Sequence, residues 1–545
     1  MTALETLADE FYDYAIALSP ISLMWTGKID RLAEWDDFTP EGRATACREL
    51  EDFAARAEAI DPGTDPQAIV LRDVIITTAR AEIARDPWTP ELLHLNPRMG
   101  VWEMLLSFIG NFPLTTAEHG EAYLAKLRAM PAMLDQLMDV AEAAAGEGRV
   151  ALRRHLEETA ASVEGYLNTA AGASERLCCQ AAPTGLDEAG RRAWTQQRNR
   201  IVAELVRPAL RDFAARVSAL AERGMPDDKP GLVHLEGGAQ VYRGKMWSNL
   251  LIDITPEQVH QMGLDQVAKL EDEYRALAGP LLGTDDIAEI YARLRDDESL
   301  RYDSADAIVA DAEKALAKAN AEAPKWFRHL PVSECTAHAT EFGAMAYYST
   351  PDPKTGKQGQ FYFKTSDPHA WATYELEAIT YHEAIPGHHL QLALAAENES
   401  VHQVQREFHN TAFSEGWGLY TERLSEEMGM YSSDLSRIGM LSADSLRACR
   451  LVVDTGMHAL GWSREQAIQY LLDHSPMDRE HIEQEIDRYI GLPGQATAYM
   501  VGRLEIQAIR AEAEQRDGFD IRDFHDTVLR HGAVPLETLR KIVLG

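Results

Sequence analysis

The sequence predicts a mainly helical protein with a small β-sheet beside the segment that carries its chemistry. Along roughly the first 220 residues, apolar side chains recur at three- and four-residue steps, which is typical of amphipathic helices. The clearest β signal lies at 338–366, where two aromatic runs flank a loop rich in proline and glycine. These two observations define the fold class, and the chain is long enough to bury a substantial core.

The N-terminal half is predicted to be helical almost throughout. One apolar helix face is formed by Leu4, Leu7, Phe11 and Ala15. A second face, which we interpret as core, is formed by Leu124, Leu127, Met130, Leu134, Leu137 and Met138. Gly146 and Gly148 end this second segment. Pro131 lies inside it and is expected to start or kink a helix there.

A linker is predicted at 224–231, where two prolines and two glycines exclude a helix. We therefore divide the chain into a helical half, 1–225, and a catalytic half, 226–545. In the second half, Thr255 and Gln258 have the spacing of a capping box, and so do Ser463 and Gln466. Each pair predicts the start of a helix.

The predicted hairpin consists of strands at 344–348 and 360–364, joined by the loop 351–359. The segment with the most chemistry follows closely, at 374–425. The small sheet is therefore expected to lie next to the helices of that segment.

Composition excludes several classes of partner and compartment. The chain has 53 Lys and Arg against 87 Asp and Glu, a formal charge of 53 − 87 = −34, so nucleic acids and anionic membranes are not expected to bind. The five cysteines are too few and too irregular for a disulfide framework, which favours a reducing compartment: they are Cys47, Cys178, Cys179, Cys335 and Cys449. No signal peptide or membrane span is visible. We expect a cytoplasmic protein, and the oligomeric state stays open.

The most informative stretch is 381–391, Tyr-His-Glu-Ala-Ile-Pro-Gly-His-His-Leu-Gln. His382 and a second histidine could present two imidazoles to one metal ion, with Glu383 beside them as a base. On an uninterrupted helix His389 lies about 20° from His382 and His388 about 120° away. However, Pro386 must interrupt the helix, because its ring clashes with the preceding turn. Geometry therefore leaves His388 and His389 as alternatives.

A carboxylate segment follows at 413–422, Phe-Ser-Glu-Gly-Trp-Gly-Leu-Tyr-Thr-Glu. Glu415 and Glu422 are seven residues apart, so they share one face of a helix. One could bind the metal while the other orients a ligand histidine through its second ring nitrogen. The two glycines around Trp417 allow another part of the chain to approach closely.

Two further groups of polar residues lie nearer the C-terminus. Arg450, Asp454 and His458 stand at four-residue steps in an otherwise apolar helix. They form either a buried ion pair with a satisfied histidine or a polar stripe facing a catalytic cavity. Gln495 and Tyr499 are one turn apart after a Pro-Gly turn. They either donate hydrogen bonds to a substrate or belong to the core.

Taken together, the motifs HEAIPGHHLQ, SEGWGLY, R-x-x-x-D-x-x-x-H and PGQA-x-x-Y resemble those of the bacterial family called domain of unknown function 885. More broadly, the chain resembles gluzincin-type zinc metallopeptidases, which implies a large helical metallopeptidase-like fold. By this resemblance His388 is the second histidine ligand, with His389 in reserve as a supporting residue. It also implies that a strand edge containing Ala344 and Tyr347 binds the substrate backbone.

The function we expect is zinc-dependent hydrolysis of an amide bond, most simply in a short peptide. One zinc ion would be held by His382, His388 and Glu415, with Glu383 as general base. Tyr499 or His458 would stabilise the oxyanion, Gln495 would bind substrate, and Glu422 and Asp454 would support the ligands from behind. Arg450 is assigned to the catalytic group. Two alternatives stay open: a zinc-dependent hydrolase of a non-peptide amide or ester, and a metal-binding helical scaffold without turnover.

Overall fold

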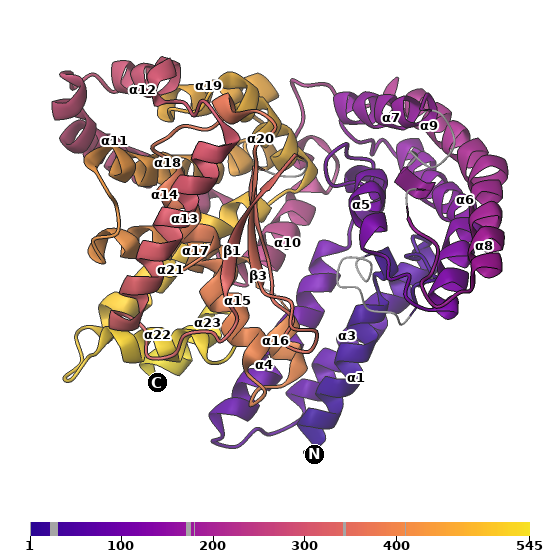
Figure 1. Ribbon diagram of the computed structural model, residues 1–545, viewed down its shortest axis with the longest axis horizontal. Helices are drawn as coiled ribbons and strands as arrows, with labels where there is room; N and C mark the ends of the chain where they lie inside the picture. Colours follow the sequence, from indigo (N-terminus) through magenta and orange to yellow (C-terminus); the bar gives the residue numbers. More distant parts are fainter. Residues whose placement is uncertain (1, 22–30, 170–175, 179, 342–344, 409) are drawn as a thin grey trace.

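The computed structural model describes residues 2–21, 31–169, 176–178, 180–341, 345–408 and 410–545 (Figure 1). It is mainly helical with one three-stranded sheet, which confirms the predicted fold class. No helix in these ranges is both long and apolar enough to cross a bilayer.

The described helices of the first 225 residues lie on one side of the molecule (Figure 1). Their bounds are Ala3–Ala17 (α1), Pro40–Glu58 (α3), Pro66–Arg85 (α4), Val101–Phe108 (α5), Ala117–Gly146 (α6), Arg153–Leu167 (α7), Glu188–Ile201 (α8) and Arg207–Ala221 (α9). Leu4, Leu7 and Phe11 are buried, as their spacing predicts.

Pro131 does not start a new helix, contrary to one of the two outcomes expected for it. It lies inside α6, which continues for 30 residues. Met130, Met133 and Leu134 on either side of it are buried, and so are the other members of the predicted apolar face. Packing of this face outweighs the cost of a proline in a helix interior, which is about 3 kcal/mol.

The rest of the chain contains the other α-helices that the structure describes. Their bounds are Gly238–Leu250 (α10), Pro256–Leu282 (α11), Ile287–Asp296 (α12), Ala305–Glu322 (α13), Leu376–Glu383 (α14), His388–Glu397 (α15), Gln403–Glu407 (α16), Thr411–Glu427 (α17), Asp434–His458 (α18), Arg464–His474 (α19), Arg479–Gly491 (α20), Ala498–Ala513 (α21), Ile521–Leu529 (α22) and Leu536–Leu544 (α23). Both predicted capping boxes are present, at the starts of α11 and α19. The predicted linker is a non-helical connection that follows α9.

The sheet has the strand order β1-β3-β2, with β1 at Cys335–Thr340, β2 at Ala346–Ser349 and β3 at Gly359–Lys364. β2 and β3 pair antiparallel, so the predicted hairpin is confirmed. β1 pairs parallel with β3 and was not predicted as a separate strand. One face of the sheet, which includes Phe361 and Phe363, packs in a small core with Leu376 of α14. This contact places the sheet beside the segment with the two histidines.

A large hydrophobic core extends through both parts of the chain. It includes residues of the N-terminal helices, such as Phe11 and Leu134, together with Trp417 of α17 and Ile506 of α21. α17 and α21 approach each other closely, because a Cβ on Gly502 would lie 2.9 Å from the Cα of Gly416. The two helices are therefore in backbone contact.

Candidate metal centre

The two histidines of the motif lie on different helices. α14 ends at Glu383 and α15 begins at His388, with a turn at 384–387 between them. Gly387 is required in this turn, since a Cβ there would lie 1.8 Å from the carbonyl oxygen of His382. The Trp417 indole N–H donates a hydrogen bond to the carbonyl of Pro386 at 3.0 Å, which holds the turn in place.

Because of this break, the two histidines do not share one uninterrupted helix, and His388 lies beside His382 in place of His389. The two imidazoles are nearly perpendicular, at 87°, with centroids 4.7 Å apart. His389 points elsewhere: its Nδ1 accepts a hydrogen bond from the Tyr348 hydroxyl at 2.8 Å, and its Nε2 donates to the Ser333 carbonyl at 3.0 Å.

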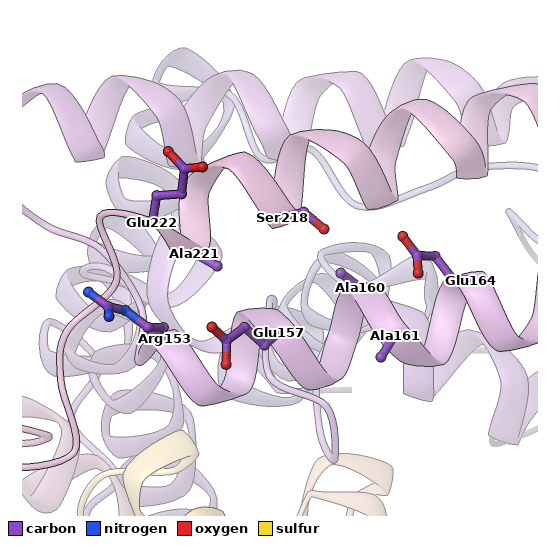
Figure 2. Close-up of a pocket in the computed structure, with 8 residues that line it drawn as sticks. All are labelled: Arg153, Glu157, Ala160, Ala161, Glu164, Ser218, Ala221 and Glu222. Atoms are coloured by element: carbon purple, nitrogen blue, oxygen red, sulfur yellow. The ribbon is translucent and has the colours of Figure 1, made fainter.

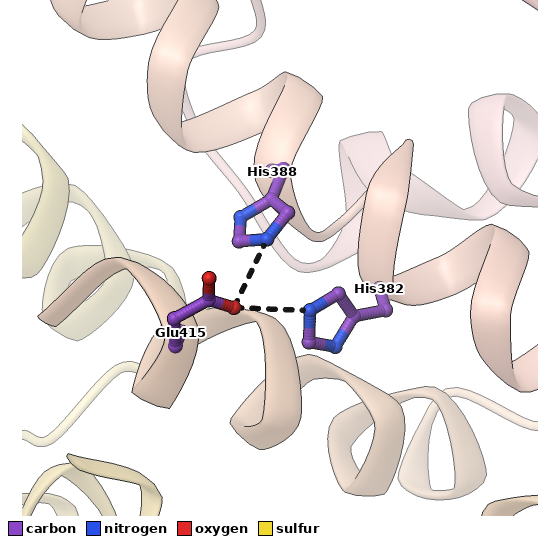
Figure 3. A group of neighbouring side chains, drawn as sticks. All are labelled: His382, His388 and Glu415. Carbon is purple, nitrogen blue, oxygen red and sulfur yellow. Dashed lines mark ion pairs between the residues drawn. The ribbon is translucent and has the colours of Figure 1, made fainter. Parts of the chain in front are cut away.

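Glu415 of α17 completes a group of three (Figure 3). Its Oε2 lies 3.6 Å from His382 Nε2 and 3.5 Å from His388 Nε2. Ligands 2.0–2.2 Å from a tetrahedral zinc ion are roughly 3.3–3.6 Å apart. Both distances from Glu415 match the spacing of ligands around one ion and are longer than an ordinary hydrogen bond. The three ligand atoms all lie within 4.8 Å of one another.

Glu422 orients the His382 ring from its other side. Its Oε1 accepts a hydrogen bond from His382 Nδ1 at 2.8 Å, so Nε2 faces Glu415. The Glu422 side chain is 1% exposed, and Arg447 Nη2 lies 3.9 Å from the same oxygen. A carboxylate behind a ligand histidine is a common arrangement in metal sites. Glu415 and Glu422 thus lie on one face of α17, as predicted, and face the two ring nitrogens of His382.

The glycines of the Gly-Trp-Gly sequence make room for this arrangement. A Cβ on Gly418 would lie 2.6 Å from Cε1 and 2.7 Å from Nε2 of His382. Gly416 meets Gly502 of α21 instead. One glycine therefore admits the imidazole, and the other admits the neighbouring helix.

The charges in this group are strongly coupled. Burial alone would raise the pKa of Glu415, but the imidazoles of His382 and His388 outweigh it and hold that pKa well below its usual range. Burial alone would lower the pKa of His382, but Glu415 and Glu422 raise it to about 9. Without a metal, the site therefore holds an ionised carboxylate against a protonated His382 ring, and a cation that binds there has to displace that proton.

Glu383 is the last residue of α14 and is half-buried. Its carboxylate makes no hydrogen bond or ion pair with any described residue. After burial, its negative charge is the second cause that raises the pKa of the Cys335 thiol, to about 12. Glu383 is therefore close to the start of β1 and is not committed to a partner.

The predicted polar stripe of α18 does not face the metal group. Leu232 N–H donates to His458 Nδ1 at 3.2 Å, and His458 Nε2 donates to the Tyr489 carbonyl at 3.1 Å. With both nitrogens occupied, His458 has no proton for an oxyanion, so that predicted role is wrong. Asp454 accepts hydrogen bonds from Tyr242 and from the Gly494 amide, at 2.6 and 3.0 Å. It supports no ligand of the triad.

The remaining predicted residues have other surroundings. Arg450 binds Tyr489 and Glu485, both of α20, and Gln495 Nε2 lies 3.5 Å from the Tyr499 hydroxyl. The Tyr347 ring stacks on Tyr362 of β3, with centroids 4.9 Å apart. Ala344 lies outside the described residues.

Several contacts of this region were not predicted from the sequence. Tyr348 and Ser333 form hydrogen bonds with His389. The Trp417 indole donates a hydrogen bond to the carbonyl of Pro386, and Glu485 accepts one from Arg450. Only Trp417 had a sequence signal, through its flanking glycines. The others are single polar residues in ordinary helix, strand or loop contexts.

A groove of about 500 Å³ lies between α7 and α9, in the N-terminal part of the chain (Figure 2). Its polar lining includes Glu157, Glu164 and Glu222 and contains no histidine. The group of three in Figure 3 has a donor set suited to chemistry, whereas this groove does not. We therefore take the metal group as the candidate site.

The fold and this site define a mainly helical protein with a His-His-Glu group of metal-binding type. The chain belongs to the family described as bacterial protein of unknown function (DUF885), whose model matches residues 20–543. No curated protein matches the chain.

Two solved structures share the fold. One, called a "putative lipoprotein", is from Colwellia psychrerythraea: it is 24% identical, covers 99% of this chain and 98% of its own, and has a TM-score of 0.91. The other, a "putative lipoprotein of unknown function", is from Shewanella oneidensis: it is 21% identical, covers 100% of both chains, and has a TM-score of 0.78.

Proposed function

We propose that this protein is a zinc-dependent hydrolase of the gluzincin type that cleaves an amide bond in short peptides. The proposal depends on one observation: Oε2 of Glu415 lies 3.5–3.6 Å from the Nε2 atoms of His388 and His382. A buried carboxylate, Glu422, fixes the orientation of the second of these rings.

Zinc fits this donor set, because two imidazoles and one carboxylate are a usual catalytic zinc site with an open fourth position. A zinc ion bound there would polarise the substrate carbonyl and lower the pKa of a water molecule toward 7. The Glu415 and His388 side chains are 23% and 12% exposed, so the group can be reached from solvent.

Glu383 is the proposed general base. It follows His382 directly, and its carboxylate has no partner among the described residues, so it is free to take a proton from water and return it to the leaving amine. Tyr499 is the proposed donor to the oxyanion. Within the described part of the chain, its hydroxyl oxygen receives only a long contact from Gln495 Nε2, at 3.5 Å, which leaves the hydroxyl proton available.

The edge of β2 is the proposed binding site for the substrate backbone. β2 pairs with β3 on one side only, among the described strands, and it contacts α14. A peptide in extended conformation could add to this open edge. The hydrogen bond between Tyr348 of β2 and His389 of α15 fixes the edge relative to the metal helices.

The experiment combines metal analysis of the purified protein with mass-spectrometric profiling of a peptide mixture, with and without chelator. We expect one zinc per chain and cleavage that the chelator abolishes. Glu383→Gln should keep the zinc and lose activity by at least about 100-fold. Retained turnover in that variant would remove the base assignment. Stoichiometric zinc without cleavage of any peptide, amide or ester would favour the scaffold alternative.

A further inference from the structure

A second group of polar residues lies at the start of α21, outside the metal triad. We call it the arginine cluster. It contains two guanidinium groups, one carboxylate, two phenols and an amide: Arg450, Glu485, Arg488, Tyr489, Gln495 and Tyr499.

The two arginines of the cluster share a single carboxylate. Arg450 Nη2 donates to Glu485 Oε2 at 2.7 Å, and Arg488 Nη2 donates to the same oxygen at 3.1 Å. The Tyr489 hydroxyl also donates to it. Asp454, one turn further along α18, has its carboxylate bound to Tyr242 and Gly494 and pairs with neither arginine. The cluster therefore has one positive charge more than its paired carboxylate balances.

One donor of Arg450 has no partner. Its Nε binds the Tyr489 hydroxyl at 2.7 Å and its Nη2 binds Glu485, but Nη1 is buried and makes no hydrogen bond with any described residue. The arginine side chain as a whole is only 7% exposed. Buried donors are nearly always paired, and an unpaired N–H on a charged group is particularly unfavourable. In a protein with a formal charge of −34, this unpaired cationic donor indicates a site for an anion.

The same part of the cluster contains weakly held polar groups. Arg488 Nη1 reaches Gln495 Oε1 only at 3.3 Å, and Gln495 Nε2 reaches Tyr499 at 3.5 Å. The Tyr499 ring stacks on the Arg450 guanidinium, 4.4 Å from its central carbon. Gln495, Arg488 and Tyr499 are all half-buried, so this side of the cluster is open to solvent. An entering carboxylate would be a better acceptor for the guanidinium groups than the Gln495 amide.

The cluster is close to the metal group. Tyr499 precedes Gly502 by one turn of α21, and Gly502 is in backbone contact with Gly416, the residue that follows Glu415. A substrate held by the zinc ligands could therefore extend to the arginines.

We propose that the arginine cluster binds the free carboxylate of the leaving amino acid, so that the protein releases C-terminal residues from peptides or acylated amino acids. This inference rests on the proposed zinc-dependent hydrolysis and adds the substrate class. Arginine suits the role because its planar fork binds a carboxylate through two parallel hydrogen bonds. Arg450 Nη1 is buried, and the Tyr499 ring lies over the same guanidinium group, so a carboxylate could reach Nη1 only after the side chains that cover it have moved.

The test uses the zinc-loaded full-length protein and two N-acylated dipeptides that differ only at the C-terminus, one a free acid and the other its amide. We expect kcat/KM to be about 100-fold higher for the acid. Arg450→Gln should abolish this preference, chiefly by raising KM for the acid. Equal wild-type rates on the two substrates, or equal losses on both in the variant, would overturn the proposal.

Two further variants separate recognition from folding. Arg450→Lys keeps the positive charge but not the fork, so it should fold and lose about 10-fold of the acid preference. Arg464→Gln is the matched control, because Arg464 is as buried as Arg450 but is fully paired with Asp487, at 2.8 and 2.9 Å. It should lower thermal stability without changing the preference. A loss of preference in this control would mean that the Arg450 effect is merely structural.

A binding measurement keeps this proposal separate from the proposed hydrolysis. Calorimetry on the metal-free protein should show at least 10-fold tighter binding of the acid than of the amide, and Arg450→Gln should remove the difference. If no substrate is hydrolysed but the binding preference is present, the proposed function fails and the carboxylate site stands. If substrates are hydrolysed but the acid is preferred neither in rate nor in binding, the proposed function stands and the carboxylate site fails.

Discussion

Replacing Gly418 by alanine should weaken zinc binding while leaving α17 intact. An added Cβ would lie 2.6 Å from Cε1 of His382, whereas carbon atoms in contact need about 3.5 Å. The imidazole and the helix must therefore separate by roughly 1 Å. Zinc–nitrogen bonds tolerate deviations of only about 0.2 Å. We expect the Kd for zinc to rise at least 10-fold, which corresponds to about 1.4 kcal/mol.

The assay is competition for zinc with a chromophoric chelator, accompanied by thermal unfolding of the metal-free protein. Gly165→Ala on α7 is the matched control, because a Cβ there meets nothing within 4 Å. This control should leave the zinc Kd unchanged and raise stability by about 0.5–1 kcal/mol, since alanine favours a helix more than glycine does. A wild-type zinc Kd in Gly418→Ala would refute the reasoning, because His382 would then not be a ligand in this position.

Three other predictions concern residues around the site and in the core. Glu422→Gln should weaken zinc binding by about 10- to 100-fold, because the carboxylate that orients His382 loses its charge; an unchanged Kd in the same competition assay would contradict this. Tyr348→Phe should raise KM for peptides and cost about 1 kcal/mol of stability, because His389 loses its hydrogen bond to the edge strand; steady-state kinetics and denaturant unfolding measure both, and a wild-type KM would count against the β2 edge. Burial lowers the pKa of Lys245 to about 7 from 10.5, so the unfolded state binds the extra proton between these values and the stability due to this lysine rises with pH across them. Lys245→Met should remove that rise, which amounts to roughly 1.4 kcal/mol per unit of pKa difference. Denaturant titrations at pH 7 and pH 9.5 measure it, and a rise that persists in the variant would contradict the prediction.

Local patterns predicted much of the fold because they act over a few residues. The capping boxes at Thr255 and Ser463 start helices as expected, since each needs only its own turn of chain. The hairpin of β2 and β3 follows from two aromatic runs and the loop between them. β1 was missed because the apolar positions of its sequence, Cys-Thr-Ala-His-Ala-Thr, carry only Cys and Ala and no aromatic or β-branched apolar residue. It is held by pairing with a strand more than 20 residues away.

The three residues of the candidate metal group are the ones predicted from the sequence. His382 and Glu415 followed from the motifs, whereas helix geometry left His388 and His389 open, because the choice depends on how the chain turns at Gly387, and the family resemblance favoured His388. That turn is determined by a contact with the His382 carbonyl and by the Trp417 indole, from a helix later in the chain. Such long-range contacts cannot be read from the local sequence.

The polar stripe of α18 shows a second limit of sequence reasoning. Regular spacing places Arg450, Asp454 and His458 on one side of a helix, but it does not say what that side meets. In the structure His458 binds the backbone at Leu232 and Tyr489, while Arg450 binds side chains of α20. Of these two residues, only Arg450 keeps a buried donor, Nη1, without a partner among the described residues.

The backbone contact between Gly416 and Gly502 has a consequence for how this protein can change. Because main-chain atoms meet there, the separation of α17 from α21 does not depend on any side chain. Larger residues at either position would push the two helices apart, and smaller ones do not exist. New selectivity in evolution or engineering would therefore have to arise from side chains on other elements, such as β2 and α20.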